Sequence, residues 1–141
     1  MRILGIDYGD SRVGIAISDP LLITAQGLET ITHNGNDKIL LKRIEEIVNE
    51  YEVKSIVIGM PINMNGTKTE RVEVTEKFIH KLKCRLGKIE IHTVDERLTT
   101  VEAHKTMNFL DINPRKKKGI VDTISAVYIL ETYMGSLKKW I

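Results

Sequence analysis

Three places in the chain carry acidic residues where a buried strand or helix would ordinarily have an apolar or small one. Asp7 ends the apolar run that opens the chain, Asp95 and Glu96 end another short run in HTVDERLTT, and Asp122 lies in IVDTISAVYIL. Carboxylates held close together in partial burial repel one another and raise each other's pKa unless a cation neutralises them. Carboxylate oxygens are the ligands that suit Mg²⁺ or Mn²⁺. These residues therefore predict a divalent metal site, provided that the fold brings them together.

The hydrophobic pattern indicates which elements must position the carboxylates. Residues 1–6 read as an apolar strand and residues 12–18 alternate, so the two predict a hairpin around a turn at 7–12. The remaining elements are expected in the order strand, helix, strand, helix, strand, helix, basic loop, helix, at residues 22–31, 36–51, 55–58, 67–86, 89–93, 99–110, 113–119 and 121–133. Two pairs of residues suggest capping boxes for helices, Thr67 with Glu70 and Thr99 with Glu102.

This order predicts an α/β fold with a mixed five-stranded sheet flanked by helices, in which three antiparallel strands precede alternating strands and helices. The first strand is apolar on both faces and should be central. Strand ends at one edge of an open α/β sheet converge on a crevice, where Asp7, Glu96 and Asp122 can meet if the last helix packs on the sheet. Asp95 neighbours Glu96 but points to the other face of the same strand, so only one of the two should be a ligand.

Each carboxylate also has an interpretation without a metal. Asp7 could be an ordinary turn residue, because aspartate is common in turns. Glu96 could be a surface charge or a partner of Arg97, and Asp122 could serve only the helix dipole near a helix N-terminus. The three together favour a metal site more than any one alone.

Glycines surround Asp7 in the first hairpin, at positions 5, 9 and 14. A glycine in a strand often marks a place where a ligand or another backbone approaches closely. We expect these positions to let a phosphate group or a metal ion approach the backbone.

Length and composition indicate one soluble globular domain that spans residues 1–141. Hydrophobic residues make up 42% of the chain and charged residues 28%, and the net charge of +2 alone does not identify a nucleic-acid binder. The single cysteine, Cys84, excludes an internal disulfide framework and fits a reducing compartment. No run approaches the roughly 18 apolar residues of a membrane span. We expect a cytoplasmic protein without a membrane partner.

Basic residues concentrate near the acidic ones. Arg115, Lys116, Lys117 and Lys118 are consecutive and lie just before Asp122 in the sequence. Basic side chains commonly contact phosphate, although a lone arginine is more often part of a solvated surface. We expect the run of four to bind nucleic-acid phosphate, and two further candidates are Arg12 and Arg97.

Four stretches carry a resemblance that covers essentially the whole chain: GIDYGDSRVGIAISD, GMPINMNGT, VDERLTT and VDTISAVYIL. Together they resemble the YqgF/RuvX family of RNase H-like proteins, known as pre-16S rRNA nucleases and Holliday junction resolvases. The resemblance implies an RNase H-like fold in which Asp7, Glu96 and Asp122 are the catalytic, metal-binding residues. It implies hydrolysis of a phosphodiester bond with two Mg²⁺ or Mn²⁺ ions about 4 Å apart and no side-chain nucleophile.

The resemblance further implies an endonuclease or exonuclease that matures the 5′ end of pre-16S rRNA in ribosome biogenesis, with pre-rRNA and the ribosome as candidate partners. One alternative is a Holliday junction resolvase acting on four-way DNA, which usually works as a dimer because it cuts two strands symmetrically. Another is a non-catalytic RNA-binding assembly factor that kept the fold. The sequence fits a monomer or a homodimer and does not choose between RNA and DNA. An actin-like ATP-binding protein would need two such domains.

Overall fold

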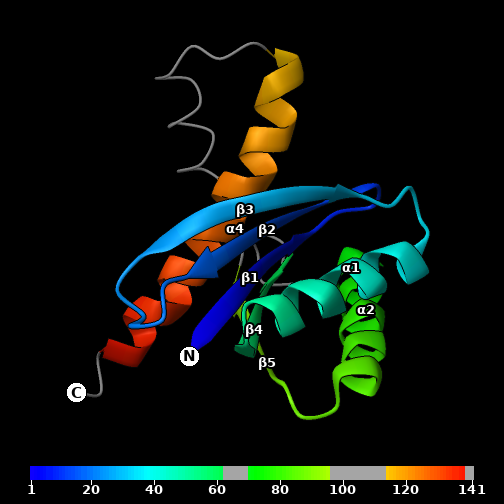
Figure 1. Ribbon diagram of the computed structural model, residues 1–141. Helices are drawn as coiled ribbons and strands as arrows, with labels where there is room; N and C mark the ends of the chain where they lie inside the picture. Colours follow the sequence, from blue (N-terminus) through cyan, green and yellow to red (C-terminus); the bar gives the residue numbers. More distant parts are fainter. Residues whose placement is uncertain (62–69, 96–113, 139–141) are drawn as a thin grey trace.

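A mixed five-stranded sheet forms the centre of the computed structural model, which describes residues 1–61, 70–95 and 114–138, with side chains in the last segment from 122 to 137. Its strand order is β3-β2-β1-β4-β5, with β2 antiparallel to both β1 and β3, and with β4 and β5 parallel to β1 (Figure 1). The strands are β1 (Arg2–Tyr8), β2 (Arg12–Ser18), β3 (Ala25–Thr32), β4 (Val53–Met60) and β5 (Glu90–Asp95). The predicted sheet and its central first strand are confirmed.

The described helices lie on opposite faces of this sheet. Helices α1 (Asp37–Glu50) and α2 (Glu70–Leu86) cover one face, and α4 (Pro114–Lys138) crosses the other (Figure 1). Helix α1 begins where the Asn36 side chain accepts a hydrogen bond of 3.1 Å from the backbone N–H of Lys38, which satisfies one of the free donors of the first turn. Its buried side chains recur at helical spacing, at Leu40, Leu41, Ile44, Ile47 and Val48.

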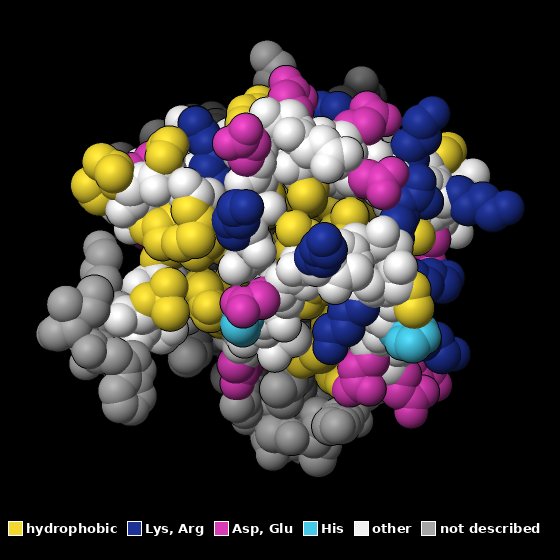
Figure 2. Space-filling model, turned by 60° about the horizontal axis from the view of Figure 1, so that its bottom comes forward, with side chains coloured by type: hydrophobic (Ala, Val, Ile, Leu, Met, Phe, Trp, Pro, Cys, Tyr) yellow, Lys and Arg dark blue, Asp and Glu magenta, His cyan; other side chains and the backbone are white. Residues whose placement is uncertain are grey.

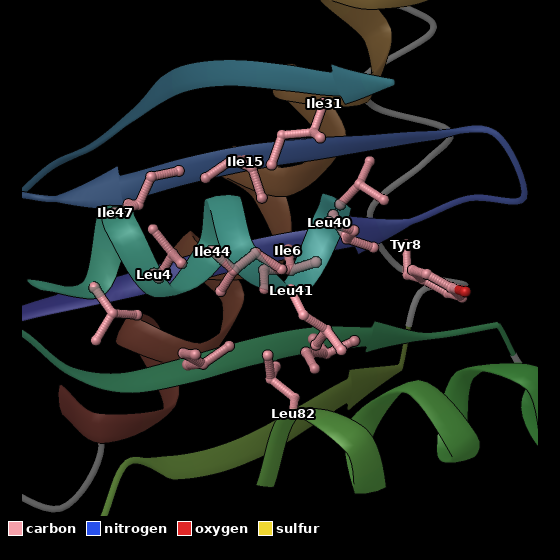
Figure 3. Close-up of a cluster of buried hydrophobic side chains, with 14 of the residues drawn as sticks. Leu4, Ile6, Tyr8, Ile15, Ile31, Leu40, Leu41, Ile44, Ile47 and Leu82 are labelled. Carbon is pink, nitrogen blue, oxygen red and sulfur yellow. The ribbon is translucent and has the colours of Figure 1, made fainter. Parts of the chain in front are cut away.

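Two hydrophobic clusters hold the layers together, and they differ in the size of their residues. The larger one, between the sheet and helices α1 and α2, contains Leu4, Ile6, Ile15, Ile44 and other large side chains (Figure 3). The smaller one lies under α4 and is formed by Ile3, Ala16, Val57, Ala126, Ile129, Leu130 and Met134. Helix α4 therefore rests on a face with fewer and smaller side chains, which allows it to come close to the strands.

Three glycines on neighbouring strands let the α4 backbone approach the sheet. A Cβ at Gly5 of β1 would lie 2.8 Å from the carbonyl oxygen of Ala126. A Cβ at Gly14 of β2 would overlap with the backbone carbonyl of Asp122, and one at Gly27 of β3 would lie 3.1 Å from a Thr123 carbon. Our expectation that the hairpin glycines admit a phosphate or a metal is wrong for Gly5 and Gly14, because the helix occupies that space.

The predicted basic loop at 113–119 is wrong from residue 114 onward, because α4 begins at Pro114. Proline is well tolerated at the first helical position, where Pro114 stands, and arginine and lysine are good helix formers. Gly119 costs the helix about 1 kcal/mol relative to alanine, which packing of the remaining turns can offset. The last helix therefore begins earlier than residue 121 and ends later than residue 133.

Other boundaries shift by smaller amounts. Strand β1 continues to Tyr8, so the turn is shorter than the predicted 7–12, and β4 extends beyond the predicted 55–58. The predicted helix at 99–110 and the two capping threonines lie outside the described residues.

The close approach of α4 predicts opposite effects for two glycine-to-alanine substitutions. Gly14→Ala should lower the free energy of unfolding by about 2 kcal/mol or more, because its Cβ meets helix backbone that cannot yield. Gly135→Ala is the matched control on α4, where an added Cβ meets nothing within 4 Å, and it should raise stability by up to about 1 kcal/mol. Urea unfolding measures both, and equal effects would contradict the packing described.

Candidate active site

Asp7 projects from the central strand toward helix α4. Side chains alternate along β1, so Asp7 shares a face with Ile3 and Gly5, both of which lie under α4. Its register partner on β2 is Gly14. The strand is paired on both sides, which fixes the backbone that carries this carboxylate.

Asp122 reaches the same place from α4. Its backbone carbonyl lies over Gly14, the residue directly across from Asp7, so the helix brings the two aspartates to one spot on the sheet. They are 115 positions apart in the sequence, and the contact between helix and glycine joins them. The structure thus brings together two of the three predicted metal ligands.

The Asp122 carboxylate lacks full compensation for its burial. Only 21% of the side chain is exposed, and its Oδ2 is buried without a hydrogen-bond partner. Burial raises the pKa of Asp122 above its ordinary value, and the nearby charge of Arg12 opposes that rise. The Nε atom of Arg12 lies 3.5 Å from Oδ2, which makes an ion pair without the geometry of a hydrogen bond. This oxygen therefore has an unused capacity to bind a cation.

Of the two other acidic candidates, Asp95 lies on the opposite face of the sheet from Asp7, and Glu96, like Arg97, lies outside the described residues. Val94 packs against the α4 cluster whereas Ile91 packs against the opposite cluster, so Asp95 lies on the face away from Asp7. In residues 1–61, 70–95 and 114–138, no group of three or more histidine, cysteine or acidic side chains is arranged to hold a metal ion. Among the predicted metal ligands, the described residues therefore contribute two, Asp7 and Asp122.

Arg12 and the α4 segment that carries the basic run lie at the same end of that helix. Arg12 begins β2, is 36% exposed on its side chain, and pairs with Asp122. The α4 backbone carries the run at positions 115–118 within two turns before Asp122, and those side chains lie outside the description. On the face shown in Figure 2, described basic and acidic side chains are interspersed rather than separated by sign. That face favours no single phosphate-binding surface.

Two residues that sequence reasoning missed hold the turn after Asp7. From α2, Arg71 donates a hydrogen bond of 3.1 Å to the carbonyl oxygen of Tyr8 and forms an ion pair of 2.6 Å with Asp10. The Nε2 atom of His33 lies 2.8 Å from the carbonyl oxygen of Gly9. Nothing in the sequence distinguishes these side chains from solvated surface residues, because their partners lie far away along the chain.

Tyr8, the neighbour of Asp7, faces the opposite side and belongs to the core. Its ring stacks on Phe78 with centroids 4.3 Å apart and on His33 with centroids 5.8 Å apart, at one end of the cluster in Figure 3. Its hydroxyl donates a hydrogen bond of 3.2 Å to Asp37 Oδ1. Burial, followed by the charge of Asp37, raises the pKa of Tyr8 to about 12. The residue that follows Asp7 is therefore a buried aromatic residue, which holds this end of the strand on the hydrophobic cluster.

This pKa predicts a defined pH dependence of stability. The native Tyr8 pKa of about 12 exceeds the ordinary tyrosine value of 10.0, so the contribution of Tyr8 to stability is complete below pH 10 and is lost as the pH rises through 12. Tyr8→Phe should destabilise the chain by about 1 kcal/mol at pH 8, through the lost hydrogen bond, and the difference should shrink between pH 10 and 12. Urea unfolding of both proteins across this range measures it, and parallel stability curves would contradict it.

Comparison with known proteins identifies the family. Residues 1–136 match the family model described as RuvX, Holliday junction resolvase. The chain belongs to the RuvX family. The resemblance seen in the sequence is thereby confirmed, and membership makes the chain a nuclease, a hydrolase of phosphodiester bonds.

The similar curated proteins align along almost their whole length. The chain is 62% identical over 137 residues to a protein of Ruminiclostridium cellulolyticum, covering 97% of this chain and 96% of that one. It is 55% identical over 139 residues to one of Acetivibrio thermocellus, covering 99% of each. Both relatives carry the name "Putative pre-16S rRNA nuclease".

Solved structures show the same fold at low identity. The chain matches T. thermophilus RuvC in complex with a Holliday junction substrate with a TM-score of 0.59 and 13% identity, covering 96% of this chain and 97% of that one. It matches the fowlpox virus Holliday junction resolvase with a TM-score of 0.58 and 12% identity, covering 96% and 99%. The RNase H-like fold is confirmed. Among the described helices, none is long and apolar enough to cross a membrane.

Proposed function

We propose that this RuvX nuclease uses divalent metal ions to cut pre-16S rRNA during maturation of its 5′ end. The observation that carries the proposal is the buried, unpartnered Oδ2 of Asp122, placed by α4 beside the register partner of Asp7. The names of the relatives described above support RNA as the substrate.

The residues present fit a divalent cation. Asp7 and Asp122 offer carboxylate oxygens, the donors that Mg²⁺ and Mn²⁺ prefer, and Glu96 would complete the set. The incomplete neutralisation of Asp122 favours a bound cation at this position. When bound, a pair of such ions supplies Lewis-acid stabilisation of the charge that develops during phosphodiester hydrolysis.

The chain's own residues supply position and charge. The central strand fixes Asp7, and the bonds from Arg71 and His33 fix the turn that follows it. Contact with Gly14 fixes Asp122. Rigid carboxylates lower the reorganisation needed during the reaction, which is the main advantage of a preorganised site.

Phosphate binding would come from the basic residues around these carboxylates. Arg12 lies at the site with part of its side chain exposed, and the run at 115–118 precedes Asp122 on the same helix. Arg97 is the further candidate. The partner is then a nucleic acid, with the assembling ribosome as its setting, in the cytoplasm and with the chain acting as a monomer.

Cleavage of four-way DNA is the second candidate function, favoured by the description of the family model. A resolvase acts on two symmetric strands and requires two active sites, hence a homodimer. The two functions therefore differ in substrate and in oligomeric state, and one paired assay separates them.

Removing either described carboxylate should abolish cleavage. Asp7→Asn and Asp122→Asn should each lower the rate more than about 100-fold, because even outer partners of metal ligands cost 10- to 100-fold. We would measure cutting of end-labelled RNA carrying the 5′ leader of pre-16S rRNA, and of a four-way DNA junction, in Mn²⁺ or Mg²⁺. EDTA should stop the reaction.

The control is Glu131→Gln, which changes an exposed acidic residue on the same helix and should leave the rate unchanged. Cutting of RNA with the junction left whole supports the rRNA nuclease, whereas symmetric nicking of the junction alone supports the resolvase. RNA binding without cutting, unaffected by Asp7→Asn, would overturn catalysis and favour an assembly factor.

A further inference from the structure

We propose that Arg12 is the counter-ion that a divalent metal displaces from Asp122, and that the released guanidinium then binds a phosphate of the nucleic acid. The inference rests on the proposed function, because it assigns a role to an arginine at the same site. It makes metal binding and substrate binding cooperative through one side chain.

The pair between Arg12 and Asp122 is loosely formed. The Nε atom of Arg12 is 3.5 Å from Oδ2 of Asp122, and this buried oxygen receives no hydrogen bond. In contrast, Arg43 holds Glu29 with two hydrogen bonds of 2.6 and 3.0 Å. An arginine fork can bind a carboxylate with two parallel bonds, and at Asp122 it does not. The guanidinium therefore neutralises this oxygen by proximity and leaves its acceptor capacity unused.

The two members of this pair differ in how closely they are packed. The backbone of Asp122 rests on Gly14, where an added Cβ would overlap with its carbonyl, so the helix cannot come closer to the strand. Arg12 is a long side chain, 36% exposed, at the first residue of β2 and next to the turn. When a cation reaches Oδ2, the guanidinium is the group that must leave.

A divalent ion and a guanidinium compete for Oδ2 because both are positive and the oxygen is buried. Like charges about 4 Å apart repel more strongly in a partly buried site than in water. Displacement would turn the five donors of the guanidinium toward solvent at the mouth of the site, where their geometry suits a phosphate. Linkage then requires that metal favours nucleic-acid binding through Arg12, and that nucleic acid favours metal binding equally.

The decisive experiment compares Arg12→Ala with the unmodified chain in two binding assays. Without nucleic acid, the variant should bind Mn²⁺ about 1.5- to 5-fold more tightly, since a competing ion pair between partly exposed side chains is worth about that much. Free Mn²⁺ is measured by electron paramagnetic resonance. A role limited to holding the fold would weaken Mn²⁺ binding instead.

The second assay measures affinity for the leader RNA in EDTA and in Ca²⁺, with a gel to check that the RNA stays intact. Arg12→Ala should lower RNA affinity about 10-fold in Ca²⁺ and much less in EDTA, where the guanidinium of the unmodified chain is still paired with Asp122. In Ca²⁺, the slope of the logarithm of RNA affinity against the logarithm of salt concentration should decrease by about the amount expected for one lost phosphate contact.

Two further variants make the test specific. Arg12→Lys keeps the charge and should recover part of the RNA affinity in Ca²⁺. Arg43→Ala removes an arginine that pairs with Glu29 and Glu46, outside the site, and it should change the result of neither assay. Thermal unfolding of each variant verifies that it is folded.

Unchanged or weaker Mn²⁺ binding by Arg12→Ala would overturn the inference, as would an equal loss of RNA affinity with and without metal. Tighter Mn²⁺ binding together with the metal-dependent RNA effect supports it, even where neither RNA nor junction is cut, and in that case the proposed function alone fails. An unmodified chain that binds no Mn²⁺ would overturn both.

Discussion

The contact between the α4 backbone and a glycine-lined face of the sheet is the constraint on which the site depends. Gly5, Gly14 and Gly27 lie on three adjacent strands, where the α4 backbone approaches the first two and the Thr123 side chain approaches the third. An added methyl group at any of them would push α4 outward by a few tenths of an ångström or more. Because Asp122 is carried by this helix and Asp7 by the strand beneath it, the packing distance sets the separation of the two carboxylates.

Such close packing has an energetic consequence for the aspartate that it places. A helix resting directly on backbone removes water from the inner side of Asp122, so one carboxylate oxygen is buried and its pKa rises. Arg12 compensates for part of this cost. A sequence selected for stability alone would place an apolar residue here, as it does one turn later at Ala126. Retaining a carboxylate at this position is typical of a site that trades stability for function.

Much of the fold could be predicted from the sequence, because strand alternation and helical spacing identify which faces are buried. The central position of β1 follows from that pattern, whereas the opposite orientations of Asp7 and Tyr8 do not, because the pattern predicts a turn from residue 7 onward and the strand continues to Tyr8. The glycines were misread, because a missing side chain indicates a close approach without naming what approaches. The start of α4 was misread because its basic stretch resembles a loop in charge but not in helix propensity. The anchoring by Arg71 depends on a contact across 63 positions, which local patterns do not encode.

The site combines rigid acceptors with mobile donors. Both described carboxylates are fixed by backbone packing, one by a strand paired on each side and the other by the helix on Gly14. The positive charge beside them belongs to a long, partly exposed side chain that makes no hydrogen bond to the buried oxygen. Metal ions need oxygen ligands at fixed positions, whereas phosphates along a flexible nucleic acid need donors that can follow them. The same helix contact that positions the backbone of Asp122 thus leaves Arg12 as the adaptable partner, and this asymmetry allows one ion pair to respond to both metal and substrate.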